Sequence, residues 1–130
     1  MVELVNDPFP DLAALNGLWR SAWGGPVAGG YERVLERSLA HVGAYEAGVL
    51  VGFVNVAWDG GVHAFVLDTC VHAGHQRKGI ATGLVRRAAE LARARGAEWL
   101  HVDFEPQLAG FYRGCGFAAS AAGVMRLSAE

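Results

Sequence analysis

The chain has 130 residues, a formal net charge of −2 and a hydrophobic content of 52%, which suit one domain over residues 1–130 and exclude a disordered chain or a general polyanion binder. Two cysteines without a CxxC pair, and histidines without zinc-ligand spacing, indicate neither a disulfide framework nor a metal site. The amino-terminal sequence lacks a signal pattern and the apolar runs are too short to span a bilayer, so we expect a cytoplasmic protein.

The amino-terminal third predicts a strand followed by two helices. Residues 2–5 (VELV) form a short apolar run. Apolar residues recur at helical spacing over residues 11–23, and Asp11 is suited to cap that helix. A glycine-rich loop over residues 24–30 precedes a second helical pattern, which we expect to cover residues 31–42.

The middle of the chain predicts strands and then a long helix. A hairpin over residues 43–61 should turn near Ala47 and Gly48, and a buried strand should follow over residues 63–71. An amphipathic pattern begins after Gly79 and ends at Gly96.

The last third predicts a strand over residues 98–104, a short helix from Pro106, and a closing hairpin over residues 118–128. The whole order indicates a mixed α/β domain.

Residues 75–81 (HQRKGIA) place two cations and a glycine at the start of the long helix. Unpaired N–H groups already make a helix start positive, so Arg77 and Lys78 indicate an anionic ligand there. The GxxxxGK[ST] loop is excluded because Ile80 and Ala81 follow Gly79, and GxGxxG is absent. These residues predict a phosphate or pyrophosphate site built from backbone amides, without a magnesium ligand.

Three segments in register resemble the GNAT N-acetyltransferases. Residues 71–81 (VHAGHQRKGIA) resemble the family's acyl-CoA pyrophosphate loop, residues 48–56 (GVLVGFVNV) its central hairpin, and residues 111–117 (FYRGCGF) its late aromatic segment. The resemblance covers roughly residues 40–120. It implies a mixed, mostly antiparallel sheet flanked by helices, in which strands four and five splay apart and acyl-CoA enters the gap.

The resemblance also implies site residues. Tyr112 would give a proton to the departing thiolate and would also contact the cofactor, and the N–H of Val71 would polarise the thioester carbonyl. The remaining cofactor-binding positions would be Cys70, Gln76, Arg77, Lys78, Gly79, Ile80, Ala81 and Thr82.

Three further residues are candidates for the acceptor side. Asp68 is an acid within an apolar strand, and we consider it as a general base, a ligand for a cationic substrate or a structural acceptor. His101 and Asp103 alternate along one strand face, where they would attract a cationic amine or would be solvated. Cys70 and Cys115 have no adjacent histidine and carboxylate, which favours small buried hydrophobes over acyl-enzyme nucleophiles.

The sequence and the resemblance together predict an acetyl-CoA-dependent N-acetyltransferase that uses direct attack by a primary amine, more readily a small molecule than a protein. The alternative is a catalytically weak acyl-CoA-binding module that acts as a sensor or in assembly. Binding of nucleic acid through the arginine-rich helix is disfavoured by the acidic net charge. No membrane partner is expected, and the resemblance is compatible with a homodimer.

Overall fold

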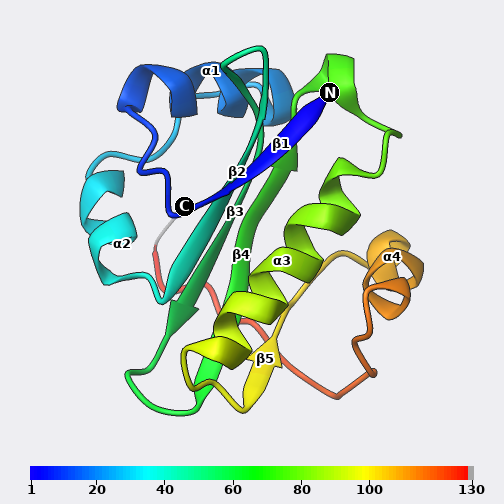
Figure 1. Ribbon diagram of the computed structural model, residues 1–130. Helices are drawn as coiled ribbons and strands as arrows, with labels where there is room; N and C mark the ends of the chain where they lie inside the picture. Colours follow the sequence, from blue (N-terminus) through cyan, green and yellow to red (C-terminus); the bar gives the residue numbers. More distant parts are fainter. Residues whose placement is uncertain (129–130) are drawn as a thin grey trace.

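The structure is a computed structural model that describes residues 1–128 and shows a five-stranded sheet with helices on both faces (Figure 1). The strands and helices, in chain order, are β1 (Val2–Asn6), α1 (Leu12–Trp23), α2 (Tyr31–Arg37), β2 (Ala40–Glu46), β3 (Val49–Trp58), β4 (His63–Val71), α3 (Ile80–Ala94), β5 (Trp99–His101) and α4 (Ala109–Gly114). Short 3₁₀ turns, Ala73–His75 and Pro106–Leu108, precede α3 and α4. The predicted mixed α/β class is confirmed.

The sheet follows the order of the chain, from β1 at one edge to β5 at the other. The first four strands are antiparallel, and β5 pairs parallel to β4. That last pairing covers only residues 63–65 of β4, opposite residues 99–101. Beyond it β4 continues to Val71 without β5 beside it, so the two strands splay apart as predicted.

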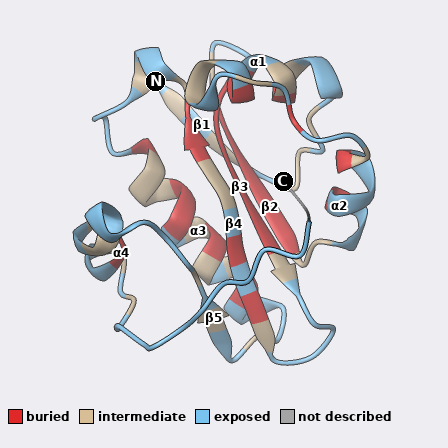
Figure 2. Cartoon of the chain, turned by 180° about the vertical axis from the view of Figure 1, so that it is seen from behind, coloured by how far each residue is buried: buried red, intermediate tan, exposed pale blue. Residues whose placement is uncertain are grey.

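Alternating side chains divide the core into two halves, one on each face of the sheet. Val54 and Val56 of β3 face α3, where they pack with fully buried residues such as Leu84. Phe53 of β3 faces the other way and packs with Trp19 of α1 and with α2. Figure 2 shows β2 and β3 buried over most of their length between these two helical layers.

The ends of α1 and α3 are set by the residues that the sequence indicated. The Asp11 side chain accepts a hydrogen bond of 2.8 Å from the N–H of Ala14, which caps α1. Gly79 begins α3 with φ = 80°, and Gly96 follows its last turn with φ = 105°. Both values lie in the left-handed region, where glycine is unstrained.

The second helix is shorter than predicted. It ends at Arg37, and residues 40–42, which we expected to be helical, begin strand β2. The reason is tertiary pairing: the N–H of Leu39 bonds to the carbonyl of Val56, and the strand that follows pairs with β1 and β3. This pairing overrides the local helical spacing.

Two predictions near the carboxyl end are also corrected. The strand expected over residues 98–104 is confined to Trp99–His101, so Asp103 lies beyond it. The closing hairpin expected over residues 118–128 is wrong, because those residues contain no strand and are exposed (Figure 2). Alanine, glycine and serine dominate this segment and offer little surface to pack on a sheet.

A buried histidine of β2 holds the segment that follows β1. His41 is 1% exposed, and its Nε2 accepts a hydrogen bond of 2.9 Å from the N–H of Phe9. The nearby Asp7 carboxylate accepts from the His41 N–H and from Arg95. Burial lowers the pKa of His41 below 6.5, and this effect outweighs the attraction of Asp7.

Protonation of His41 should therefore destabilise the fold. Since its pKa is lower in the folded state, the unfolded chain binds the proton first, and stability should be lost as the pH falls below about 6.5. Asp7 stays charged in that window because its pKa is lowered too: burial raises it, but the bonds from Arg95 and His41 prevail. We expect the thermal unfolding midpoint to decrease when the pH is lowered from 7.5 to 5.5. The decrease should be smaller in His41→Gln, whose amide oxygen can accept the hydrogen bond from the N–H of Phe9. Equal losses in both proteins would contradict this assignment.

Candidate functional site

A cavity of about 420 Å³ opens where β4 leaves the sheet and α3 begins; we call it the loop pocket. It is lined by residues 69–71 of β4, by residues 75–82 apart from Lys78, by Ala22 and Trp23 of α1, and by Leu108, Phe111 and Tyr112 around α4. The structure therefore brings together nearly all the residues that the sequence assigned to a cofactor. Lys78 is exposed and lies outside the lining.

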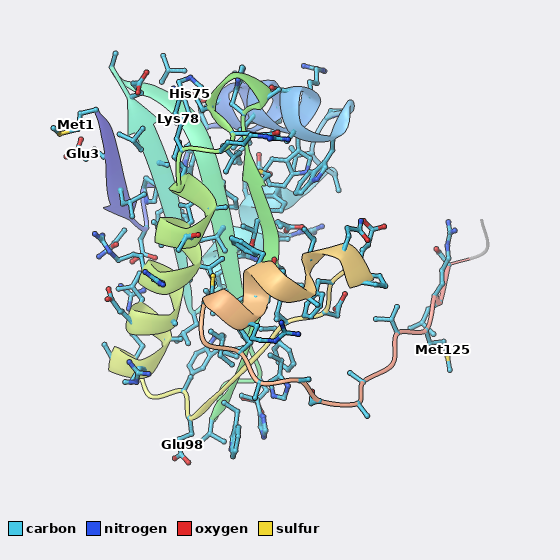
Figure 3. The ribbon with its side chains drawn as sticks, turned by 90° about the vertical axis from the view of Figure 1, so that its right-hand side faces the viewer. Met1, Glu3, His75, Lys78, Glu98 and Met125 are labelled. Carbon is cyan, nitrogen blue, oxygen red and sulfur yellow. The ribbon has the colours of Figure 1, made fainter. Side chains whose placement is uncertain are left out.

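The backbone of residues 76–82 has the polarity that an anion requires. Among residues 1–128, the N–H groups of this segment form no well-aligned hydrogen bond, and the first bond of α3 runs from the N–H of Gly83 to Gly79. Arg77 and Gly79 both have left-handed backbone angles, which turn successive N–H groups towards one side. Figure 3 shows this loop, with His75 and Lys78, above the first turn of α3.

The N–H of Val71 points into the gap between β4 and β5. The N–H of the next residue, His72, donates to Val51 of β3. Because N–H directions alternate along a strand, the N–H of Val71 faces away from β3. Val71 also lines the loop pocket, so a carbonyl oxygen in the gap could accept from it.

Tyr112 lies at the opposite wall of the loop pocket. Its ring is stacked on Phe104 and packs edge-on against Phe117, and the residue is 7% exposed. Burial raises the pKa of Tyr112, although the nearby Thr69 hydroxyl acts in the opposite direction. The phenol is therefore protonated at neutral pH and can serve as a proton donor.

Cys70 lies on the same wall of the loop pocket as Val71, but its thiol is a poor nucleophile. It is 5% exposed, and burial together with the charge of Asp68 raises the pKa of its thiol to about 12. Burial also raises the pKa of Cys115. Neither thiol forms a useful fraction of thiolate at neutral pH.

A second cavity, of about 430 Å³, lies between α2 and the sheet; we call it the α2 pocket. Its walls come from α1 and the loop after it, from α2, from β3 and from β4, and it contains Asp68. Asp68 has φ = 59°, a left-handed conformation that aspartate tolerates better than most residues. The conformation arises at a bulge, because β4 has one more residue than β3 between the pairs Phe53–Cys70 and Asn55–Leu67.

The partner of Asp68 is Tyr31, a residue that the sequence analysis placed only at a helix start. Its hydroxyl donates a hydrogen bond of 2.8 Å to Oδ2 of Asp68. Burial, followed by the charge of Asp68, raises the pKa of Tyr31 far above its usual value, so Tyr31 remains a donor. A buried tyrosine needs a hydrogen-bond partner for its hydroxyl, which is the one signal that the sequence offers for this pair. Because Asp68 is 37 residues away, the sequence does not identify it as that partner.

Adjacent residues of β4 line the two pockets at the bulge. Asp68 lines the α2 pocket, and the next residues, Thr69 and Cys70, line the loop pocket. On the helical side the boundary is Trp19, in the α2 pocket, packed edge-on against Trp23, in the loop pocket, with ring centres 5.0 Å apart. Two residues of β4, Thr69 and Cys70, thus lie between the Asp68 carboxylate in one cavity and the Val71 N–H in the other.

The other two predicted acceptor residues lie elsewhere. His101 of β5 contacts His63, with 2.9 Å between Nε2 and Nδ1, and stacks on Phe65. Asp103 is exposed beyond β5, close enough to Tyr112 to contribute to its raised pKa. Neither His101 nor Asp103 lines either pocket.

The described part of the chain offers neither a cluster of metal ligands nor a membrane-spanning helix. Residues 1–128 contain no group of three or more histidine, cysteine or acidic side chains placed to hold a metal ion. Within the same residues, no helix combines the length and apolar character needed to cross a membrane.

Solved structures share this fold along nearly the whole chain. A probable acetyltransferase of unknown function from meticillin-resistant Staphylococcus aureus matches with a TM-score of 0.84 and 19% identity, covering 99% of this chain and 100% of that one. A GNAT-family acetyltransferase from Streptococcus pneumoniae matches with a TM-score of 0.80 and 24% identity, covering all of both chains. An aminoglycoside acetyltransferase from an uncultured soil sample matches with a TM-score of 0.75 and 20% identity, covering 99% of each chain.

The sequence itself carries the family assignment. No protein with a curated description matches it. Residues 3–117, however, match the acetyltransferase (GNAT) family over most of the chain, which confirms the resemblance seen in the motifs. The chain belongs to the GNAT acetyltransferase family.

Proposed function

We propose that this chain transfers an acetyl group from acetyl-CoA to a small primary amine by direct attack. The observation that carries the proposal is that adjacent residues of β4 line the two pockets at the bulge, with Asp68 in one and the Val71 N–H in the other. Because the family generally uses acetyl-CoA, we assign the loop pocket to that donor and the α2 pocket to the amine.

The residues of the loop pocket suit the donor. The unbonded N–H groups of residues 76–82 and the guanidinium of Arg77 match a pyrophosphate. Acetyl-CoA supplies an activated thioester, which reacts with an amine without a metal. The Val71 N–H would hold the carbonyl oxygen as negative charge develops there.

Two side chains would move the protons. The Asp68 carboxylate, oriented by Tyr31, would accept the proton that the amine loses as its nitrogen bonds to the acetyl carbon. Tyr112 would donate a proton to the sulfur as the carbon–sulfur bond breaks. The volume of the α2 pocket, about 430 Å³, and the likeness to an aminoglycoside acetyltransferase favour a small acceptor over a protein.

Gly79 tests the donor site. A Cβ at this position would meet no protein atom within 4 Å, so a loss of affinity in Gly79→Ala would report the ligand and the local loop geometry. We expect acetyl-CoA to bind in calorimetric titrations, unlike ATP or NAD, and to bind Gly79→Ala at least about tenfold more weakly, roughly 1.4 kcal/mol.

Gly96→Ala is the matched control for Gly79→Ala. Gly96 also has a left-handed angle and open space around its Cβ position, but lies at the other end of α3. It should show a similar backbone strain and unchanged acetyl-CoA affinity. Unchanged affinity in a folded Gly79→Ala protein would refute the pyrophosphate assignment.

Tyr112→Phe tests catalysis. Phenylalanine keeps the stacking on Phe104 and removes the proton donor, so we expect kcat to fall by about a hundredfold or more while acetyl-CoA affinity changes little. Thiol release with a panel of small amines measures the rate. Tyr45→Phe removes a hydroxyl that lines neither pocket and should be neutral. An acyl-CoA-binding module, the alternative, would bind acetyl-CoA and show no turnover in any variant.

Direct attack also predicts that Cys70 is dispensable as a nucleophile. With a pKa of about 12, only about one thiol in ten thousand is ionised at pH 8. We expect iodoacetamide to leave Cys70 of the native protein unmodified by mass spectrometry at pH 8 and to modify it after unfolding. Rapid labelling of native Cys70, or an acetylated Cys70 after mixing with acetyl-CoA, would contradict the mechanism.

A further inference from the structure

The α2 pocket contains a buried amide group that the proposed reaction does not use. Asn55 of β3 is 0% exposed, and its Oδ1 accepts from the Ser38 hydroxyl, which it shares with the Val34 carbonyl. Among residues 1–128, the Nδ2 of Asn55 has no hydrogen-bond partner. An unsatisfied buried donor costs about 1–3 kcal/mol, so the group calls for an acceptor atom inside the pocket.

A cation lies at the same end of the pocket. Arg37 is the last residue of α2, directly before the Ser38 that contacts Asn55, and it lines the cavity. Within the described residues, Arg37 forms no ion pair. This end therefore presents a guanidinium and an amide donor, a combination that suits a carboxylate or another anionic oxygen group.

The pocket has the opposite charge at the other end of α2, and Asn55 lies between, paired with Leu67, the residue before Asp68. Tyr31, the first residue of α2, holds Asp68 there, and Asp68 is the only acidic residue among the cavity's described lining. Tyr31 and Arg37 are six positions apart, which corresponds to a rise of about 9 Å along the helix axis. A single small molecule can thus reach both ends.

The surface between the two ends is apolar. Trp19 and Leu67 belong to it, and the side chains of Trp58 and Val34 border it; Leu67, Trp58 and Val34 are substantially exposed. A ligand with an apolar body would cover this surface and would gain about 25 cal/mol for each Å² of apolar area removed from water.

We infer that the acceptor is a small amine that carries an anionic group on an apolar body, with the amine at Asp68 and the anion at Arg37 and Asn55. This inference rests on the proposed acetyl transfer for the identity of the amine end. It makes Arg37 and Asn55 specificity-determining residues, which touch the acceptor and take no part in proton transfer.

Matched pairs of amines test the inference directly. 4-(Aminomethyl)benzoate and L-phenylalanine carry a carboxylate at a long and a short distance from the amine, and benzylamine and phenethylamine are the same molecules without it. We expect kcat/KM for at least one acid to exceed that of its partner by about tenfold. An equal or higher kcat/KM for both uncharged partners would overturn the inference and leave the acetyltransferase proposal standing.

Three variants assign the preference to residues. Arg37→Gln should raise KM for the preferred acid about tenfold at constant kcat, without affecting the partner amine. Asn55→Asp replaces the free donor with an acceptor and should abolish the preference. Arg33→Gln, one turn earlier on α2 and outside the pocket lining, is the matched control and should behave as wild type. Equal effects of Arg37→Gln and Arg33→Gln would overturn the assignment.

Two measurements separate failure of this inference from failure of the proposed function. Unchanged acetyl-CoA affinity shows that each variant is folded. If Asn55→Asp does not fold, Asn55→Ala replaces it, because alanine also removes the amide donor. Tryptophan fluorescence, to which Trp19 and Trp58 of the pocket contribute along with the two other tryptophans, gives the affinity of each acid without turnover. Binding of an acid that Arg37→Gln weakens would support the inference even if no amine is acetylated, and failure of both acids to bind would overturn it.

Discussion

The arrangement of both cavities depends on one extra residue in β4. The bulge shifts the register of β4 against β3 by one residue. Such a shift exchanges the faces of the sheet to which the side chains of β4 point. The bulge lets Asp68 face the α2 side while Cys70 and Val71 border the loop pocket. The left-handed angle of Asp68 is the local strain that this geometry requires, and the bond from Tyr31 helps to hold it.

The two pockets differ in the charge and polarity of their lining residues. The loop pocket is rich in donors, with N–H groups that form no well-aligned hydrogen bond in the described chain and the Arg77 guanidinium at its rim. The α2 pocket has both signs of charge, an acid held by Tyr31 at one end and Arg37 at the other. In the proposed reaction the first arrangement anchors a polyanion, and the second selects an acceptor with groups of both signs.

The sequence predicted local features well and distant contacts poorly. The loop before α3, its glycine at 79 and the position of Tyr112 follow from short motifs whose spacing survives in the fold. The partnership of Tyr31 with Asp68 joins residues 37 positions apart and has no local signature. The same limitation explains the overlong second helix, whose last residues are drawn into the sheet by strand pairing.

The two cavities share no lining residue, and this separation affects the order of events in the proposed reaction. Each cavity has its own section of β4 and its own tryptophan, Trp19 or Trp23. Donor and acceptor can then arrive in either sequence and must be present together before transfer. The proposed reaction would then follow ternary-complex kinetics with random addition, and spent CoA would be able to depart while the acetylated product is still in place.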